Sequence, residues 1–136
     1  MNINVVGLIL CCQQFAKQAK EAKKSGVIVN ISSMASTIGG RKHKSVYAAS
    51  KGAVDVFTVG AAKELAPQGI SVFSVRPGVT RTDMTNATLS NANTKAAIEA
   101  SIACGSVAEP SDIARPVIDL ISGNFNYASG SMLNLS

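Results

Sequence analysis

The sequence predicts an α/β fold built on a parallel β-sheet. Segments of helical periodicity alternate along the chain with short β-branched runs, which is the pattern of helix and strand units in such sheets. The run at residues 26–33 (GVIVNISS) shows no polar alternation until its end, as expected for a strand that is buried on both faces. A second buried strand is predicted at residues 70–75 and a last strand at residues 132–135.

Two long helices are predicted beside these strands. The first covers residues 5–24, and Ser25-Gly26 ends it. Its buried face is expected to hold the residues at helical spacing, which are Leu8, Cys11, Cys12, Phe15, Ala19 and Ala22. The second covers residues 46–65 and ends before Pro67. Its many alanines and glycines would let another helix approach closely.

A long polar stretch, residues 83–106, follows the second strand. It is rich in Asn, Ser, Thr and Ala, and long excursions of this kind within a domain are usually functional, so we interpret it as a substrate lid. A last helix is expected from Pro110 to about Ile121. Pro116 lies inside this helix, where a missing N–H and a steric clash cost about 3 kcal/mol unless the helix kinks.

The composition excludes several classes of protein. The 136 residues fit one domain, and 46% hydrophobic against 15% charged residues excludes a disordered chain. A net charge of +5 with 4% aromatics and no Trp gives no reason to expect nucleic acid as a partner. The longest apolar run, residues 5–12, is too short to span a membrane and lacks the flanks of a signal peptide. We therefore expect a cytoplasmic protein whose three cysteines are reduced core residues, with no metal site.

The strongest chemical signal is the segment Tyr47-Ala-Ala-Ser-Lys51. A Tyr and a Lys four residues apart lie on one face of a helix, one turn from each other. Free tyrosine has a pKa near 10, so it is a weak acid or base at neutral pH. A neighbouring ammonium favours the phenolate and brings that pKa toward the working range. The spacing therefore suits proton transfer, although Tyr-x-x-x-Lys alone is a common pattern.

Three further segments add to this signal. Ser32 and Ser33 end the first strand, and open parallel sheets bind ligands at the carboxyl ends of their strands. Arg76-Pro77-Gly78, continuing to Thr82, follows the second strand and emerges at the same edge. Asn4-Val-Val-Gly7 begins the first helix.

In this order the segments resemble the short-chain dehydrogenase/reductase family. The matching motifs are N-x-x-G, N-I-S-S, Y-x-x-x-K, P-G-x-x-x-T and E-P-S-D-I-A, which together span the chain from Asn4 to Leu135. The chain looks like the classical type, similar to glucose 1-dehydrogenases and 3-oxoacyl-carrier-protein reductases. The resemblance implies a doubly wound Rossmann-type sheet, NAD or NADP as cofactor, and a small alcohol or carbonyl substrate. It also implies a homo-oligomer, a tetramer or dimer, joined through helices 5–24 and 46–65.

The resemblance also implies roles for individual residues. Tyr47 would be the general acid or base, and Lys51 would lower its pKa and bind the nicotinamide ribose. Ser33 would orient the substrate carbonyl, with Ser32 as the alternative. Asn4 would hold a water that links Lys51 to solvent, with Asn2 as the weaker alternative.

The turn after the second strand would bind the cofactor and border the substrate. The residues implied for the cofactor are Tyr47, Lys51, Pro77, Gly78, Thr80 and Thr82, and those for the substrate are Ser33 and Val79. Simpler roles stay open, since Asn4 could cap a helix start and Thr82 could cap the lid. We interpret His43 and the basic cluster of residues 41–44 as an exposed, solvated loop.

One departure from the family limits these implications. No glycine-rich dinucleotide-binding turn stands ahead of Tyr47, where the family has one. We therefore expect a C-terminal half of the fold, without the first βαβ nucleotide-binding half and with an uncovered sheet edge. The alternative to an oxidoreductase is a catalytically inactive fragment that acts at most as a helix-mediated association module.

Overall fold

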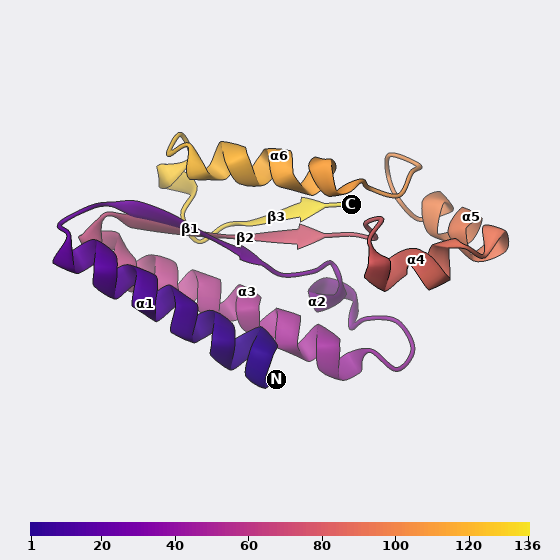
Figure 1. Cartoon of the computed structure of the whole chain (residues 1–136), viewed down its shortest axis with the longest axis horizontal. Coiled ribbons are helices and arrows are strands. Elements are labelled where there is room, and N and C mark those ends of the chain that lie inside the picture. The colour runs from indigo at the N-terminus through magenta and orange to yellow at the C-terminus, as the bar shows by residue number, and fades with distance from the viewer.

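The computed structural model describes residues 1–136 as three layers with a parallel sheet in the middle. Helices α1 (Leu8–Glu21) and α3 (Ser45–Leu65) lie on one face of the sheet, and α6 (Pro110–Ile121) lies on the other (Figure 1). Shorter elements join these layers: α2 (Ala35–Ile38) and 3₁₀ turns at Ala66–Gln68 and Asn126–Ala128. The predicted α/β architecture is confirmed.

The sheet contains three parallel strands in the order β1-β2-β3. Strand β1 (Gly26–Ile31) pairs with β2 (Ile70–Pro77), which pairs in turn with β3 (Met132–Leu135). The first strand ends two residues earlier than predicted, and the second continues two residues further. Because β1 pairs only with β2, its other edge is uncovered, as expected from the sequence.

Helix α3 packs on the centre of the sheet because its inward face carries small side chains. Ala61 and Ala62 of α3 form a buried cluster with Ala16 and Ala19 of α1 and with Ile70 and Val72 of β2. Small residues allow the helix and the strand to approach closely, so α3 is held rigidly above β2. The start of α3 at Ser45 is within one residue of the prediction.

The N-terminal helix differs from the prediction. Residues Asn2–Gly7 form a π-helix, and α1 continues from Leu8 to Glu21. Of the face predicted to be buried, only Cys12 and Ala19 are buried, joined by Ala16, while Cys11, Phe15 and Ala22 are exposed. All of these residues except Ala22 lie within the regular helix α1, where the buried Cys12, Ala16 and Ala19 are spaced by four and three residues. The buried face therefore keeps the helical period, but it is narrower than predicted and includes Ala16.

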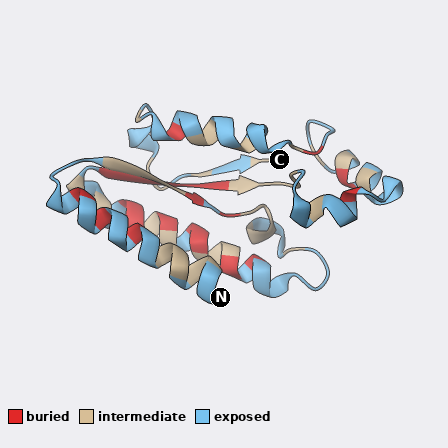
Figure 2. Ribbon diagram, in the orientation of Figure 1, coloured by how far each residue is buried: buried red, intermediate tan, exposed pale blue.

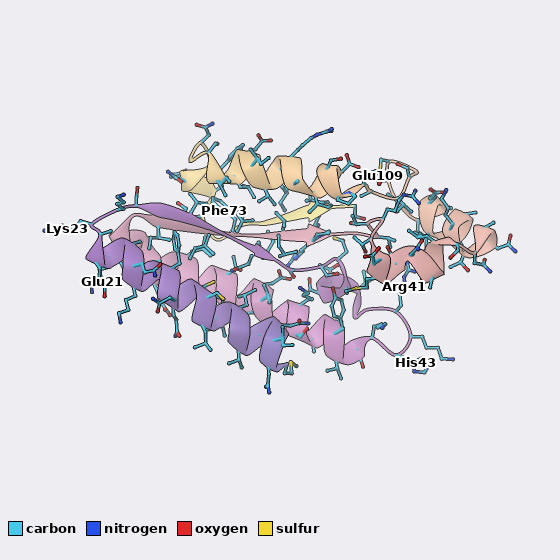
Figure 3. The ribbon with its side chains drawn as sticks, in the orientation of Figure 1. Glu21, Lys23, Arg41, His43, Phe73 and Glu109 are labelled. Carbon is cyan, nitrogen blue, oxygen red and sulfur yellow. The ribbon has the colours of Figure 1, made fainter.

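The opposite face of the sheet packs against α6. Phe73, Val75 and Leu120 are buried there, and Phe73 lies between the sheet and α6 (Figure 3). Helix α6 continues through Pro116, whose ring lines a hollow beside Phe73 and Leu120. The proline is therefore accommodated within the helix, with the loss of the hydrogen bond that its N–H would have made to Asp112.

The lid segment, residues 83–106, extends beyond the carboxyl end of the sheet (Figure 1). It folds into α4 (Asp83–Leu89) and α5 (Ala92–Ala100), and Leu89 and Ile98 form its small core with Val107. Its two ends are joined by an isolated bridge between Thr80 and Ala108. The Arg81 guanidinium also lies 2.7 Å from the Glu109 carboxylate.

Burial is concentrated in the sheet and on the helix faces turned toward it (Figure 2). The expectation that all three cysteines are core residues was wrong, since Cys12 is buried but Cys11 and Cys104 are exposed. Large apolar side chains of the π-helix, α1 and α3 also face solvent, among them Ile3, Val6, Leu10, Val46 and Val56. No helix is both long enough and apolar enough to cross a membrane.

Candidate active site

Tyr47 and Lys51 occupy the first two turns of α3, near the carboxyl end of the sheet. The Tyr47 side chain is partly exposed, at 37%. The Lys51 Nζ lies over the Tyr47 ring, 5.8 Å from its centre, and donates a hydrogen bond of 2.8 Å to the Ile31 carbonyl at the end of β1. The predicted pairing of phenol and ammonium on one helix face is therefore present.

The Lys51 ammonium is partly withdrawn from solvent between α3 and β1. Burial lowers the pKa of Lys51, because removal from water disfavours the charged form. The Asp55 carboxylate, one turn further along α3, opposes that change through its negative charge. The charge on Lys51 thus depends on its neighbours along the same helix face.

The structure separates the two candidate serines. The Ser32 side chain is buried and donates a 3.0 Å hydrogen bond to the carbonyl of Lys51, which fastens α3 to the end of β1. Ser33 is half-buried, and its Oγ accepts a 3.1 Å bond from the Ala35 N–H, so its hydroxyl proton is available for another acceptor. Ser33 is therefore the better placed of the two to act on a substrate.

Asn4 lies inside the π-helix and caps no helix, so the capping role considered for it was wrong. Its amide donates to the Ser50 hydroxyl at 3.1 Å, and that hydroxyl donates to the Tyr47 carbonyl at 2.7 Å. Asn4 therefore contacts α3 at Ser50, which is bonded to the backbone of Tyr47. Asn2, the weaker alternative, is exposed at the first turn of the π-helix.

Backbone hydrogen bonds hold the turn after β2 against both of its neighbours. The Met34 N–H donates to the Pro77 carbonyl at 3.0 Å, and the Gly78 N–H donates to the Leu135 carbonyl at 2.8 Å. A side chain on Gly78 would come within 3.0 Å of Ser136 and 3.3 Å of the Leu135 carbonyl, so glycine permits this close approach. The segments after β1, β2 and β3 thus form one continuous edge.

The remaining candidates lie where this edge meets the lid segment. Thr82 is the N-cap of α4, and its N–H donates to the Thr85 hydroxyl at 3.0 Å, so the capping role considered for it is confirmed. The Thr80 hydroxyl donates to the Gly78 carbonyl at 3.3 Å. The Val79 side chain packs against the small core of the lid segment, so its contact with substrate stays a prediction.

Other charged and metal-binding groups lie outside this arrangement. Arg41 and His43 are exposed on the loop between α2 and α3, as predicted (Figure 3). No group of three or more His, Cys, Asp or Glu residues is arranged to hold a metal ion. The candidate site as described brings together a phenol, an ammonium, a hydroxyl and the backbone of a glycine turn.

Comparison with known proteins agrees with this arrangement. The profile of the family described as Enoyl-(Acyl carrier protein) reductase matches residues 1–135. The chain belongs to the short-chain dehydrogenase/reductase family. A relative in this family, the 3alpha-hydroxysteroid dehydrogenase of Mediterraneibacter gnavus, is 42% identical over 135 residues, which cover 99% of this chain and 52% of that protein.

Solved structures of family members share this fold closely. A 4-hydroxyisoleucine dehydrogenase in complex with NADH matches with a TM-score of 0.92 and 30% identity, over 98% of this chain and 55% of that one. An NADP-bound protein from Agrobacterium tumefaciens, assigned as a 2-deoxy-D-gluconate 3-dehydrogenase, matches with a TM-score of 0.93 and 34% identity, over 100% and 55% of the two chains. The chain therefore spans about half the length of the relatives it matches, which agrees with the expectation of a partial family fold.

Several polar residues at this site were not singled out from the sequence. Ser50 connects Asn4 to the backbone of Tyr47, and Asp55 and Arg76 form a buried ion pair below Lys51. A signal for the pair was present, because Asp55 is the only charged residue between Lys51 and Lys63, and Arg76 is the only one in β2. A lone charge in an apolar element requires a buried partner.

Proposed function

We propose that this chain carries the catalytic half of an NAD- or NADP-dependent oxidoreductase that interconverts a small alcohol and the corresponding carbonyl compound. The observation that carries the proposal is the Lys51 ammonium held over the Tyr47 ring at the carboxyl end of a parallel sheet. NADP-bound and NADH-bound family members match this fold with TM-scores of 0.93 and 0.92, which supports the choice of cofactor class.

In this proposal Tyr47 moves the proton. Its hydroxyl protonates the carbonyl oxygen during reduction and accepts the alcohol proton during oxidation. The Lys51 ammonium stabilises the phenolate that forms, and the Ser33 hydroxyl donates to the substrate oxygen as negative charge develops on it. When bound, the nicotinamide cofactor supplies or accepts the hydride.

The residues present fit the nicotinamide end of such a cofactor. Lys51 would bind the ribose, and the turn at Pro77-Gly78 with the backbone of Thr80 would position the carboxamide. The backbone groups of this turn lie at the strand edge where open parallel sheets bind their ligands. Thr82 would add a hydroxyl at the start of the lid segment. The pyrophosphate has no comparable site within residues 1–136, because none of the three strands leads into a glycine-rich turn that opens a helix.

The lid segment would close over the substrate. A cavity of about 210 Å³ lies between the turn after β2 and the base of the lid segment, and it is lined by Gly78, Val79, Ile102, Ser106, Ala108 and Ile113, among others. Tyr47, Lys51 and Ser33 do not line this cavity, so its volume does not define the size of the substrate. The relatives named above act on hydroxysteroids or hydroxy acids, so we propose a secondary alcohol, with no choice among these classes.

We also propose that the complete protein is a homo-oligomer joined through α1 and α3. Val56 at the middle of α3 is 75% exposed, and side chains added at Gly52 or Gly60 would meet nothing within 4 Å. Apolar and small residues on one outward helix face favour close packing with a second helix pair. The same face supports the association module that is the alternative to catalysis.

The experiment that tests the proposed function is Tyr47→Phe in the complete protein that contains residues 1–136. Secondary alcohols are screened with NAD and NADP, and turnover is followed by nicotinamide absorbance. Tyr47→Phe should lower kcat by about 10²–10⁴-fold while the cofactor Kd changes little, because the ring remains and only its proton is lost. If Tyr47→Phe turns over like the wild type, Tyr47 is not the proton donor or acceptor. If the wild-type protein is inactive but still forms oligomers, the result favours the association module.

A further inference from the structure

A largely buried ion pair joins α3 and β2 one helical turn from Lys51. The Arg76 Nε lies 2.9 Å from Oδ2 of Asp55, and the two side chains are only 17% and 7% exposed. The Ser74 hydroxyl donates to the other carboxylate oxygen of Asp55 at 3.0 Å. Both oxygens of the Asp55 carboxylate are therefore paired within the core.

This pair connects the catalytic helix to two strands. Tyr47, Lys51 and Asp55 are spaced by four residues, so they follow one face of α3 at successive turns. Arg76 immediately precedes Pro77 in β2 and lies opposite Asn134 of β3, with its Nη1 3.5 Å from the Asn134 side-chain oxygen. The two charges thus stand between the turn of α3 that carries Lys51 and the glycine turn proposed to bind nicotinamide.

We propose that Asp55 and Arg76 are positioning residues for this site, Asp55 through the Lys51 turn of α3 and Arg76 through the start of the Pro77-Gly78 turn. This inference rests on the proposed function for its catalytic consequence. Neither side chain touches the substrate, and both act through the groups that would hold the ribose and the nicotinamide.

A purely structural role would not require charges here. Buried ion pairs contribute little net stability, because the cost of removing both ions from water offsets their attraction. A carboxylate one helical turn from a half-buried ammonium does change the pKa of that ammonium. The groups around Lys51 are the Tyr47 phenol and the Asp55 carboxylate on α3, with the Arg76 guanidinium beyond Asp55 on β2. Asp55 favours the charged form of Lys51. We expect the positive charge of Arg76, which is paired with the same carboxylate, to act in the opposite direction.

The first test measures Lys51 itself and requires no turnover. In the complete protein, the lysines are reductively methylated with an isotope label, the Lys51 resonance is assigned with Lys51→Arg, and its pKa is titrated by NMR. Asp55→Asn should lower the pKa of Lys51 relative to wild type, because the favourable negative charge is gone. Arg76→Gln should raise it. The matched control is Asp119→Asn, an exposed carboxylate on α6 across the sheet, which should leave the pKa unchanged.

The second test measures catalysis in the same variants. Asp55→Asn and Arg76→Gln should lower kcat/KM for the cofactor by about 10- to 100-fold, since small displacements of positioning groups have effects of this size. The pH–rate profile should move to higher pH in Asp55→Asn, because a less charged Lys51 supports the Tyr47 phenolate less. Asp55→Glu, which keeps the charge, should recover part of the loss.

The two readouts separate failure of the inference from failure of the proposed function. If the pKa of Lys51 is the same in Asp55→Asn as in Asp119→Asn, the positioning role is wrong whatever the activity. If the pKa moves as expected but the wild-type protein has no turnover, the inference about Lys51 stands and the proposed function fails. If Asp55→Asn does not fold by circular dichroism, Arg76→Gln decides the question, and an unchanged Lys51 pKa together with an unchanged kcat/KM in Arg76→Gln would overturn the proposal.

Discussion

The Lys51 ammonium stands over the ring of Tyr47, with its Nζ 5.8 Å from the ring centre, and donates to the carbonyl of Ile31. Lys51 therefore contacts both Tyr47, one turn earlier in α3, and the end of β1. The distance lies within the range of a cation–π contact, which adds to the effect of the charge on the phenol. Mutation can separate the two roles proposed for Lys51, towards the phenol and towards the cofactor, from the role proposed for Tyr47.

Lys51→Ala in the complete protein should lower kcat and also weaken cofactor binding, whereas Tyr47→Phe should lower kcat alone. The variant removes both the charge that favours the Tyr47 phenolate and the proposed ribose donor. The pH–rate profile should move to higher pH, because no ammonium then stabilises the negative charge that develops on the phenol oxygen in the proposed reaction. Steady-state kinetics across pH and a cofactor titration measure both effects. Lys63→Ala, an exposed lysine near the end of the same helix, is the control. An unmoved profile with an unchanged cofactor Kd would contradict the dual role.

Residues 1–136 as an isolated chain should not bind NAD(H) or NADP(H) measurably. The residues proposed for the nicotinamide end are present, but the pyrophosphate lacks the backbone donors and helix N-terminus that hold this anion. The exposed lysines and arginines are no substitute, since salt screens such charges strongly. Isothermal titration on the purified chain measures this directly, with the complete protein as the positive control. Micromolar binding of NADH by the isolated chain would reveal a phosphate site elsewhere in these residues.

Val56→Asp should dissociate the proposed oligomer while changing the unfolding midpoint of the separated subunits little. Val56 is exposed at the middle of α3, so a carboxylate there costs little in a monomer but is unpaired in a helix interface. Light scattering coupled to size-exclusion chromatography measures the mass. Met84→Asp, on the exposed surface of the lid segment, is the matched control. An unchanged mass for Val56→Asp would place the interface elsewhere.

The three thiols should differ in reactivity. Cys11 and Cys104 are exposed and should react with an aromatic disulfide reagent at the rate of free thiols, whereas Cys12 should react only after unfolding. Cys12 is buried, and its Sγ lies 3.4 Å from the Asn30 side-chain oxygen. Counting released thiolate before and after addition of denaturant checks this prediction. Fast reaction at three sites in the folded protein would show that α1 opens readily.

Cys12 should also make stability depend on pH. Burial, with a smaller contribution from Cys11, raises the pKa of the Cys12 thiol. A group whose pKa is higher in the folded than in the unfolded state stabilises the folded state. This stabilisation is complete below the unfolded pKa, which is about 8.5 for a thiol, and it is lost as the pH rises through the folded pKa. The free energy of unfolding, measured with urea from pH 7 upward, should therefore fall more steeply for wild type than for Cys12→Ala. Equal slopes would indicate that Cys12 ionises normally in the folded state.

The order of elements and the pairing of Tyr47 with Lys51 could be predicted because they are local properties. A spacing of four residues defines neighbours on a helix wherever the helix lies, and β-branched runs favour strands before any partner is known. Helix 45–65 and the parallel strands followed from such spacings. The turn at Pro77-Gly78 could be predicted because proline and glycine interrupt a strand.

Features that depend on contacts between distant segments could not be predicted in this way. The π-helix at residues 2–7 and the narrow buried face of α1, which includes Ala16, are not visible in the periodicity of the sequence. Ser32 and Ser33 are adjacent hydroxyls, and only the docking of α3 on β1 directs one into the core and leaves the other at the site edge. Asp55 and Arg76 are 21 residues apart, and their pairing arises because α3 crosses β2 at one particular register. Short-range periodicity determines which residues share a face, whereas the packing of whole elements determines which faces meet.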